Sequence, residues 1–322
     1  MARQASDISP HRGSSLVAEA AGDQPAPDRD PAPAVSIGLP VYNGERYLRN
    51  SLDALLAQTF TDFELIISDN ASTDSTAAIC QEYAARDCRI RYVRQRTNIG
   101  AAPNHNFVAA LARGRLFKWA SHDDLYHPDL LRQCVEALEA HPEVVLAHCW
   151  DAYVDETGEM TSLAPYRLDT ANPSARARLR SLLYTPGGND FYGVIRTDVL
   201  RRVRPHQTYY NADRTFMAGL VLAGPFHQVP RVLYFRREHP NRASHGTRRA
   251  RAATLAPGRA NRIRNPMLRM YVEYVLDFAR AVWLAPVTRR ERFWCLLEVA
   301  GWVLSCLWPG RRRALLEQIG TS

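Results

Sequence analysis

The chain has 322 residues, 46% of them hydrophobic, and a net charge of +8 from 41 basic and 33 acidic side chains. This fits one large globular domain with appendages, and the absence of an apolar run of about 18 residues argues against a membrane-spanning helix. The N-terminus lacks the basic and then apolar pattern of a signal peptide, and the six cysteines show no Cys-x-x-Cys spacing. We therefore expect a cytoplasmic protein with buried free thiols, without a zinc site or disulfides.

Residues 1–34 are rich in Ala, Pro, Asp, Ser and Gly and show no hydrophobic periodicity. This composition cannot bury enough apolar surface to fold, so the segment is predicted to be a disordered tail. Order is expected to begin where short apolar runs start to alternate with amphipathic segments. The predicted strands are Val35–Val41, Phe63–Ser68, Ile90–Val93, a run beginning at Leu116, and Val144–Trp150.

Amphipathic segments follow the strands, with apolar residues at helical spacing. The residues expected on the inner helix faces are Leu48, Leu52, Leu55 and Leu56, then Ala77, Cys80 and Tyr83, then Phe107, Val108 and Leu111, and then Leu130, Leu131, Cys134, Val135 and Leu138. Ser72 or Thr73 is expected to cap the second helix. Pro103 and Pro128 are expected to open the third and fourth. Alternation over roughly 110 residues predicts an α/β fold, Rossmann-like, with a mostly parallel sheet and helices on both faces.

Polar side chains follow four predicted strands at the point where each strand ends. They are Asn43, Asp69, Asn98 and Asp123. Ligands of parallel sheets bind beyond the carboxyl ends of the strands, so these side chains are expected to meet at one site. Helix capping at each β–α turn is the competing explanation.

The turn Ser121-His-Asp-Asp124 places two adjacent carboxylates at a strand end. Such oxygens suit Mg²⁺ or Mn²⁺, which often hold phosphates too, although Asp also stabilises turns by local hydrogen bonds. The turn after the first strand reads Pro40-Val-Tyr-Asn-Gly44 rather than Gly-x-Gly-x-x-Gly, so a glycine-rich phosphate loop is not expected. A cation on Asp123 is expected to bind the phosphates instead.

Four motifs stand in a recognisable order and spacing. They are Gly38-Leu-Pro-Val-Tyr-Asn-Gly44, Ile67-Ser-Asp-Asn-Ala-Ser-Thr-Asp74, Asn98-Ile-Gly100, and Ser121-His-Asp-Asp124 with Pro128 and Leu131. Together they resemble glycosyltransferase family 2, the inverting enzymes of GT-A fold. The resemblance covers roughly Val35 to His245 and implies a GT-A glycosyltransferase domain over residues 35–245.

The resemblance also implies roles in binding a nucleotide sugar. The residues that would line the nucleotide pocket are Pro40, Tyr42, Asn43, Asn98 and Gly100. Asp69 would accept a hydrogen bond from the imide N–H of the base.

The Ser121–Asp124 tetrad would be the family's Asp-x-Asp region, with Asp123 as the usual metal ligand and Mn²⁺ or Mg²⁺ as the cofactor. Ser121 stands where the family often has Asp, so one carboxylate is missing from the expected metal site. Ser121 or His122 would contact the ribose. Asp124 would face the sugar or the acceptor.

In the second half, Gly187–Gly193 resembles the acceptor-side region of the family. Asp213 stands at the second of two positions where the family usually has acids, and it is implied to be the catalytic base. Ala212 replaces the first acid. Without the resemblance, Asp213 would be an ordinary N-terminal helix residue favoured by the helix dipole. The helix after it is expected to bury Phe216, Leu220 and Val221.

Val229–Arg236 is predicted to be an edge strand, and Arg237–His245 resembles the family's closing Tyr-Arg-x-His-x-x-Ser stretch. His239 is implied to bind metal or diphosphate and Arg242 to pair with phosphate, although a lone His is more often structural. His245 is the weaker candidate.

Residues 246–265 are predicted to be an Arg-rich flexible loop, within a stretch that has seven arginines and no acid from Asn241 to Asn265. A solvated loop, a lid ordered by the donor, and a patch for phosphate, nucleic acid or anionic lipid are the alternatives. No aromatic residue is interleaved with the arginines, so a nucleic-acid partner is not expected.

Residues 266–322 are predicted to be a C-terminal helical extension. Phe293–Trp308 is rich in Trp and Leu and is followed by Arg311–Arg313. This pattern fits peripheral contact with the inner face of the cell membrane. A helix packed on the catalytic domain or on a second subunit of a homodimer is the alternative.

The sequence therefore predicts a metal-dependent, inverting glycosyltransferase. Its donor would be a UDP-, dTDP- or GDP-linked sugar, and its acceptor a hydroxyl of a glycan or a lipid-linked molecule in cell-envelope polysaccharide synthesis. A sugar nucleotidyltransferase is one alternative, but it usually carries a Gly-rich phosphate loop. A nucleotide-sugar-binding scaffold with little turnover is another, because Ser121 and Ala212 stand where the family often has acids.

Overall fold

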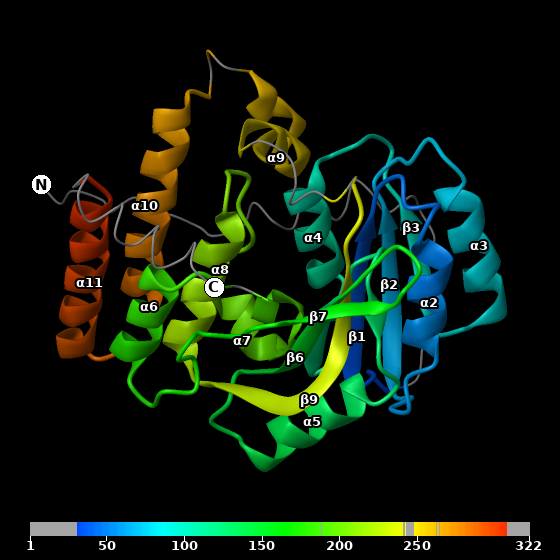
Figure 1. Ribbon diagram of the computed structural model, residues 1–322, viewed down its shortest axis with the longest axis horizontal. Helices are drawn as coiled ribbons and strands as arrows, with labels where there is room; N and C mark the ends of the chain where they lie inside the picture. The colour runs from blue at the N-terminus through cyan, green and yellow to red at the C-terminus, as the bar shows by residue number, and fades with distance from the viewer. Residues whose placement is uncertain are drawn as a thin grey trace, which may run out of the picture.

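A mixed β-sheet runs through the centre of the molecule in this computed structural model, which describes residues 31–187, 189–240, 242, 248–261, 263 and 265–307 (Figure 1). The strands lie in the order β3 (Ile90–Arg94), β2 (Phe63–Asp69), β1 (Val35–Val41), β4 (Leu116–Trp119), β8 (Val194–Arg196), β6 (Leu146–Val154), β9 (Phe226–Arg237) and β5 (Leu125–Tyr126), and β7 (Met160–Ala164) pairs with β6. β1 pairs in parallel with β2 and β4, and β2 with β3. The carboxyl ends of these four strands therefore meet at one edge of the sheet.

The second half of the sheet keeps most of this direction. β8 is antiparallel to both β4 and β6, so β6 runs the same way as β4, and β9 is parallel to β6. Val229–Arg236 was expected to be an edge strand. In the structure, β9 pairs with β6 on one side and with the two-residue strand β5 on the other, so β5 is the last strand of the sheet. The mostly parallel sheet predicted from the sequence is confirmed.

Helices cover both faces of the sheet, each over its own apolar core. They are α2 (Leu48–Leu56), α3 (Thr76–Arg86) and α5 (Leu130–Ala140) on one face, and α4 (Ala101–Ala110), α6 (Ala175–Tyr184), α7 (Thr197–Arg202) and α8 (Ala212–Ala223) on the other. Leu65 and Ile67 of β2 enter the first core, whereas Ile66 between them enters the second. Alternate strand residues thus serve opposite faces, as the pleat of a strand requires.

Several helix starts differ from the predicted ones. α3 begins at Thr76 with Ser75 before it, and neither Ser72 nor Thr73 caps it. The Ser72 hydroxyl instead accepts the N–H of Asn43 at 2.9 Å, so it joins two loops. α4 begins at Ala101, two residues before the expected Pro103.

The Arg-rich segment contains α9 (Arg248–Leu255) and the 3₁₀ helix η3 (Pro257–Ala260), contrary to the expectation of a flexible loop. Ala252 explains the order, because it is fully buried in a small apolar cluster with Tyr209, Ala212 and Met270. The packing of a single alanine and the close approach to Gly100 could not be foreseen in a run dominated by arginine.

The C-terminal extension forms α10 (Met267–Leu284) and α11 (Arg289–Leu307), and its helical character is confirmed over these residues. α10 packs on α8, and α11 packs on α6 and α10, at the left of Figure 1. No helix in the described part of the chain is long and apolar enough to cross a bilayer. The tail up to residue 30, His245 and Arg311–Arg313 lie outside the described residues.

Candidate active site

The loops after β1 and β2 are tied together by hydrogen bonds at the carboxyl edge of the sheet. Asn43 has a left-handed backbone with φ 49°, and its Oδ1 accepts the N–H of Thr73 at 2.9 Å. The N–H of Gly44 donates to Thr76 Oγ1 at 2.8 Å. Asn43 therefore shapes the rim of the predicted nucleotide pocket, where Pro40 is buried and Tyr42 is exposed.

Asp69 is fully buried, and protein groups already surround its carboxylate. Oδ1 accepts the N–H of Ser72 at 2.8 Å, and Oδ2 accepts the Tyr92 hydroxyl at 3.0 Å and lies 3.5 Å from Arg94 Nε. Its neighbour Asn70 was not singled out from the sequence. Asn70 donates to Asn98 Oδ1 at 3.0 Å and accepts the N–H of Ile99 at 2.8 Å. Asn70 thus joins the β2 and β3 loops. Asp69 supports the same loops through its hydrogen bonds with Ser72 and Tyr92.

Gly100 borders α9. Its φ is +92°, and a Cβ added there would lie 2.6 Å from the Leu255 carbonyl oxygen and 2.8 Å from Ala256 Cα. The end of α9 therefore rests directly on the loop that was predicted to border the ribose and base. Only glycine fits both this backbone conformation and this close approach.

Asp123 lies at the centre of the candidate site. Ser121 Oγ donates to its Oδ1, and His239 Nε2 lies 3.0 Å from its Oδ2. Burial acts to raise the pKa of Asp123, but the charge of His122, the hydrogen bonds from Ser121 and His239, and the charge of Arg242 outweigh it and lower that pKa to about 2. Asp123 is therefore a partly buried carboxylate that its neighbours hold in the ionised form.

The side chain of Asp124 points elsewhere. It is buried, and it accepts the Tyr234 hydroxyl at 2.5 Å and the N–H of Arg237 at 2.9 Å. Burial and the charge of Asp123 raise the pKa of Asp124. These contacts fasten the turn to β9, so the structure does not support the expectation that Asp124 faces the sugar or acceptor.

Cationic side chains from the end of β9 surround Asp123. Arg237 Nε donates to the Asp123 carbonyl oxygen at 3.0 Å, and its guanidinium lies 4.8 Å from the centre of the Tyr47 ring. Arg242 donates to the Arg237 carbonyl oxygen at 3.0 Å. His239 packs against Tyr47 with ring centres 5.0 Å apart. Tyr47 was missed from the sequence because nothing in a helix-start tyrosine signals a role at a distant strand.

His239 Nε2 and Asp123 Oδ2 are 3.0 Å apart, the length of an N–H···O hydrogen bond. An imidazole nitrogen and a carboxylate oxygen are also groups that a divalent cation can bind together in place of that hydrogen bond. No cluster of three or more His, Cys, Asp or Glu side chains suited to a metal occurs among the described residues. An ion here would therefore need water or a bound ligand to complete its coordination, as Mg²⁺ commonly does.

Asp213 belongs to a second group of residues, in the first turn of α8. Arg214 donates to the carbonyl oxygens of Gly187 at 2.9 Å and Thr185 at 3.0 Å, which fixes the start of α8 beside the Gly187–Gly193 loop. Ala212, at the position of the missing acid, is buried in the α9 cluster. The predicted base therefore lies next to the predicted acceptor-side region.

Asp190 within that loop was given no role from the sequence. It is fully buried in the 3₁₀ helix η1 (Asn189–Tyr192) and accepts the Tyr166 hydroxyl at 2.8 Å. Burial raises its pKa to about 6, and the charge of Asp213 adds to the rise. Only burial, which a loop sequence does not reveal, distinguishes it from an exposed aspartate.

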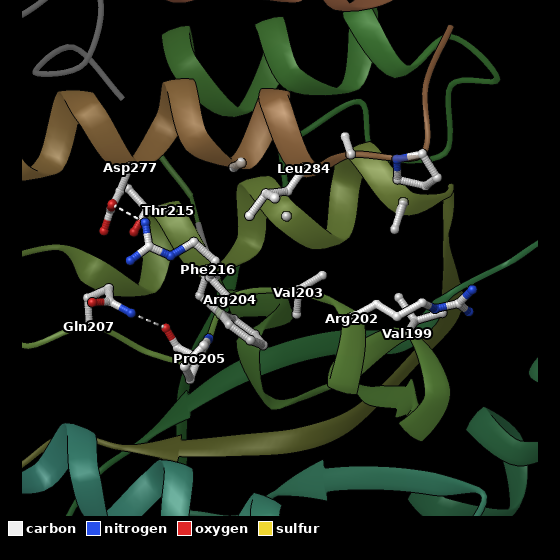
Figure 2. Close-up of a pocket in the computed structure, with 15 residues that line it drawn as sticks. Val199, Arg202, Val203, Arg204, Pro205, Gln207, Thr215, Phe216, Asp277 and Leu284 are labelled. Carbon is white, nitrogen blue, oxygen red and sulfur yellow. Dashed lines mark hydrogen bonds and ion pairs between the residues drawn. The ribbon is translucent and has the colours of Figure 1, made fainter. Parts of the chain in front are cut away.

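A cavity of about 160 Å³ lies away from these residues, between α7, α8 and α10 (Figure 2). Its floor is apolar, and Arg204 forms an ion pair at 2.6 Å with the buried Asp277 at one end. Asp277 also accepts the Tyr209 hydroxyl at 2.6 Å. The cavity thus borders the loop that leads to Asp213, but it is not the site at the strand ends.

The chain matches known proteins over the part that carries these motifs. Residues 36–204 match the model of glycosyl transferase family 2. An uncharacterized glycosyltransferase of Rickettsia typhi is 32% identical over 126 residues, which are 39% of this chain and 38% of that protein. The chondroitin synthase of Escherichia coli is 32% identical over 130 residues, 40% of this chain and 19% of that protein. The matches thus span well under half the length of these relatives.

Solved structures show the same fold at low identity. TarS of S. aureus in complex with UDP-GlcNAc has a TM-score of 0.62 and 18% identity, covering 84% of this chain and 72% of that one. A mannosyltransferase from Pyrobaculum calidifontis, in complex with GDP-Man and Mn²⁺, has a TM-score of 0.51 and 20% identity, covering 91% and 86%. The predicted GT-A fold is therefore confirmed, and the chain belongs to glycosyl transferase family 2.

Proposed function

We propose that this protein transfers a sugar from a nucleoside-diphosphate sugar to a hydroxyl acceptor, with inversion at the anomeric carbon and with the help of a divalent cation. The observation that carries the proposal is the contact of Asp123 with His239, 3.0 Å apart, at the carboxyl edge of the parallel strands. Nucleotides commonly bind at this edge of such sheets. The similar structures hold UDP, UDP-GlcNAc or GDP-Man, which supports a donor of this class.

The diphosphate would bind beside Asp123. Asp123 and His239 would hold Mn²⁺ or Mg²⁺, and the ion would act as a Lewis acid that stabilises the leaving diphosphate. Arg242 would add a positive charge near the phosphates, since its charge already acts on the Asp123 carboxylate. Ser121 orients Asp123 through its hydroxyl, which is a different task from the carboxylate that the family often has there.

The nucleoside would lie along the rim made by the β1, β2 and β3 loops. Tyr42 is exposed there and can pack on the base or ribose, beside Pro40, Asn43, Asn98 and Gly100. We assign the polar contact with the base to this rim. Asp69 supports it through Ser72 and Tyr92.

Asp213 would act as the general base. Its carboxylate would take the proton of the acceptor hydroxyl as that oxygen forms a bond to the anomeric carbon, while the bond from that carbon to the diphosphate oxygen breaks. One direct displacement inverts the anomeric centre. Asp213 lies in the first turn of α8, which Arg214 fixes beside the Gly187–Gly193 loop. This place suits a group that must meet the acceptor.

The donor would be UDP-, dTDP- or GDP-linked and the acceptor a glycan or a lipid-linked molecule of the cell envelope. A binding scaffold without turnover is the alternative, favoured by the apolar packing of Ala212 where the family often has an acid.

Release of nucleoside diphosphate from a panel of nucleotide sugars with Mn²⁺ tests the proposal. Release by the wild type, lost in Asp213→Asn and Asp123→Ala, supports it. Asp198→Asn is the matched control, because this exposed acid of α7 pairs, among the residues that the structure describes, with Arg202 on the same helix. Nucleotide binding without release under any condition would instead identify a scaffold.

A further inference from the structure

Exposed large apolar side chains concentrate on the two C-terminal helices. Of the fifteen that are exposed among the described residues, ten lie on α10 and α11. Single exposed apolar residues are normal on protein surfaces, but a concentrated set marks a binding face.

The exposed residues of α10 form one stripe. Leu268, Val272 and Leu276 recur every four residues, and Trp283 continues the same face two turns later. Trp283 is 67% exposed, whereas Phe278 on the opposite face is 1% exposed. The buried face already packs on α8, so the stripe is a second apolar face, exposed among the residues that the structure describes.

α11 has the same arrangement. Phe293, Leu297 and Leu304 share one exposed face. The opposite face packs on α6, where the buried Glu298 pairs with Arg176 at 2.7 Å and Arg180 at 2.9 Å. Packing on the catalytic domain thus accounts for only half of each helix. Figure 1 shows α10 (orange) and α11 (red) side by side at the margin of the molecule.

Most acidic side chains of these helices are held in ion pairs, whereas several arginines reach solvent. Glu291, at the start of α11, is half-buried and accepts hydrogen bonds from Thr288. Asp277 and Glu298 are buried in ion pairs, and Glu273 is bound by Arg259 and Arg269. Arg289 and Arg290 are exposed at the start of α11. The sequence after α11 continues with Trp308 and then Arg311–Arg313. Arginine beside Trp, Phe and Leu is the composition of helices that lie in a membrane interface.

We propose that the exposed faces of α10 and α11 bind the surface of an anionic lipid bilayer, with Trp283 and Phe293 entering the interface and the arginines meeting lipid phosphates. A second copy of the chain fits less well, because it would bring the same basic faces together. Trp prefers the bilayer interface, which suits a side chain as exposed as Trp283. The inference does not depend on sugar transfer.

Sedimentation of the full chain with vesicles tests this surface. We expect binding to vesicles of phosphatidylcholine with phosphatidylglycerol, weakened by salt, and little binding to phosphatidylcholine alone. In the triple variant Leu276→Ser, Trp283→Ser, Leu297→Ser, the partition coefficient should fall at least about tenfold, because three apolar anchors are lost. The control Trp150→Ser, Leu163→Ser removes exposed apolar residues of β6 and β7 and should bind like the wild type.

A second measurement keeps the test valid if the triple variant folds poorly. Vesicles with brominated lipid should quench the tryptophan fluorescence of the wild type, and quench Trp283→Phe less. Equal sedimentation of the triple variant and wild type, or no binding of wild type to anionic vesicles, would overturn the proposal. The proposal would also be overturned if the wild type did not bind vesicles but formed a dimer that the triple substitution dissociates.

Discussion

At the scale of single residues, the adjacent Asp123 and Asp124 are predicted to have different roles, Asp123 in binding a cation and Asp124 in holding the turn to β9. Asp123→Asn should keep its hydrogen-bonding shape but lose the charge that a cation needs, so Mn²⁺-dependent affinity for a nucleoside diphosphate should fall at least about tenfold. Asp124→Ala should leave Tyr234 and the Arg237 N–H without their acceptor and cost about 1–3 kcal/mol of unfolding free energy.

Calorimetric titration and urea unfolding of both variants would separate the two tasks. Asp123→Asn loses the favourable interactions that lower the pKa of Asp123 to about 2, so it should be less stable than the wild type at pH 7, and its nucleotide binding is measured where urea unfolding shows it folded. Folded Asp124→Ala should bind nucleotide nearly as well as the wild type. A loss of Mn²⁺-dependent binding in Asp124→Ala at wild-type stability would contradict the structural role of that residue.

Asp190 gives a pH dependence whose sign follows from its burial. Its pKa is raised from 3.8 to about 6, mainly by burial, so the carboxylate is more stable in the unfolded chain than in the folded one. Its contribution to stability is present below pH 4 and is lost as pH rises to about 6. Asp190→Asn cannot ionise but can still accept the Tyr166 hydroxyl.

We therefore expect the unfolding free energy of the wild type, relative to Asp190→Asn, to fall by about 2–3 kcal/mol between pH 4 and pH 7. Urea unfolding of both proteins at the two pH values measures this difference. Burial raises the pKa of Asp151 to about 7, and the charge of Asp190 contributes to that rise, so both proteins are compared in an Asp151→Asn background. A difference that does not change with pH would show that Asp190 is solvated or paired in solution.

At the scale of elements, the close contact between Gly100 and the end of α9 helps to keep the Arg-rich segment packed on the domain. Gly100→Ala would place a Cβ 2.6 Å from the Leu255 carbonyl oxygen, in a backbone conformation that strains alanine. We expect α9 to detach and trypsin to cut faster at arginines such as Arg251 and Arg259. Gly258→Ala in η3 is the matched control, since nothing lies within 4 Å of its added Cβ.

Peptide mapping after short digestion would locate the cuts. Equal cleavage in the two variants would show that α9 is not held through Gly100. A nucleoside diphosphate that slows cleavage of the wild type would indicate, in addition, that the donor orders this segment.

At the scale of the whole molecule, the sequence was most informative where pattern and geometry coincide. Short apolar runs predicted β1 and β2, and apolar residues at helical spacing predicted α5, down to the five buried residues of α5. The order of strands beyond β4 could not be predicted, because β8 inserts antiparallel through contacts distant in sequence. The contact of His239 with Asp123 bridges 116 residues, and the family motif pointed to both positions without showing their distance.

The parts of the site that sequence missed depend on burial. Asp124 and Asp123 are neighbours of the same type, and only the Tyr234 hydroxyl and the strand β9 make one of them structural. In the sequence, Asp190 does not differ from other loop acids, and only the fold shows that it is buried within η1. Side-chain direction in turns is set by the neighbours that fold around them, so residue type alone does not assign a role.

The C-terminal helices belong to the same folding unit as the sheet, since Phe278 and Val282 share a core with α6 and α8. Phe278→Ala should therefore cost about 3–5 kcal/mol and shift the whole unfolding transition. Phe293→Ala, a matched change at an exposed site, should cost less than about 0.5 kcal/mol. Unfolding followed by far-UV dichroism and by tryptophan fluorescence should give coincident transitions in all three proteins. If Phe278→Ala instead split the unfolding transition into two steps, the extension would be a separate unit attached to an independently stable domain.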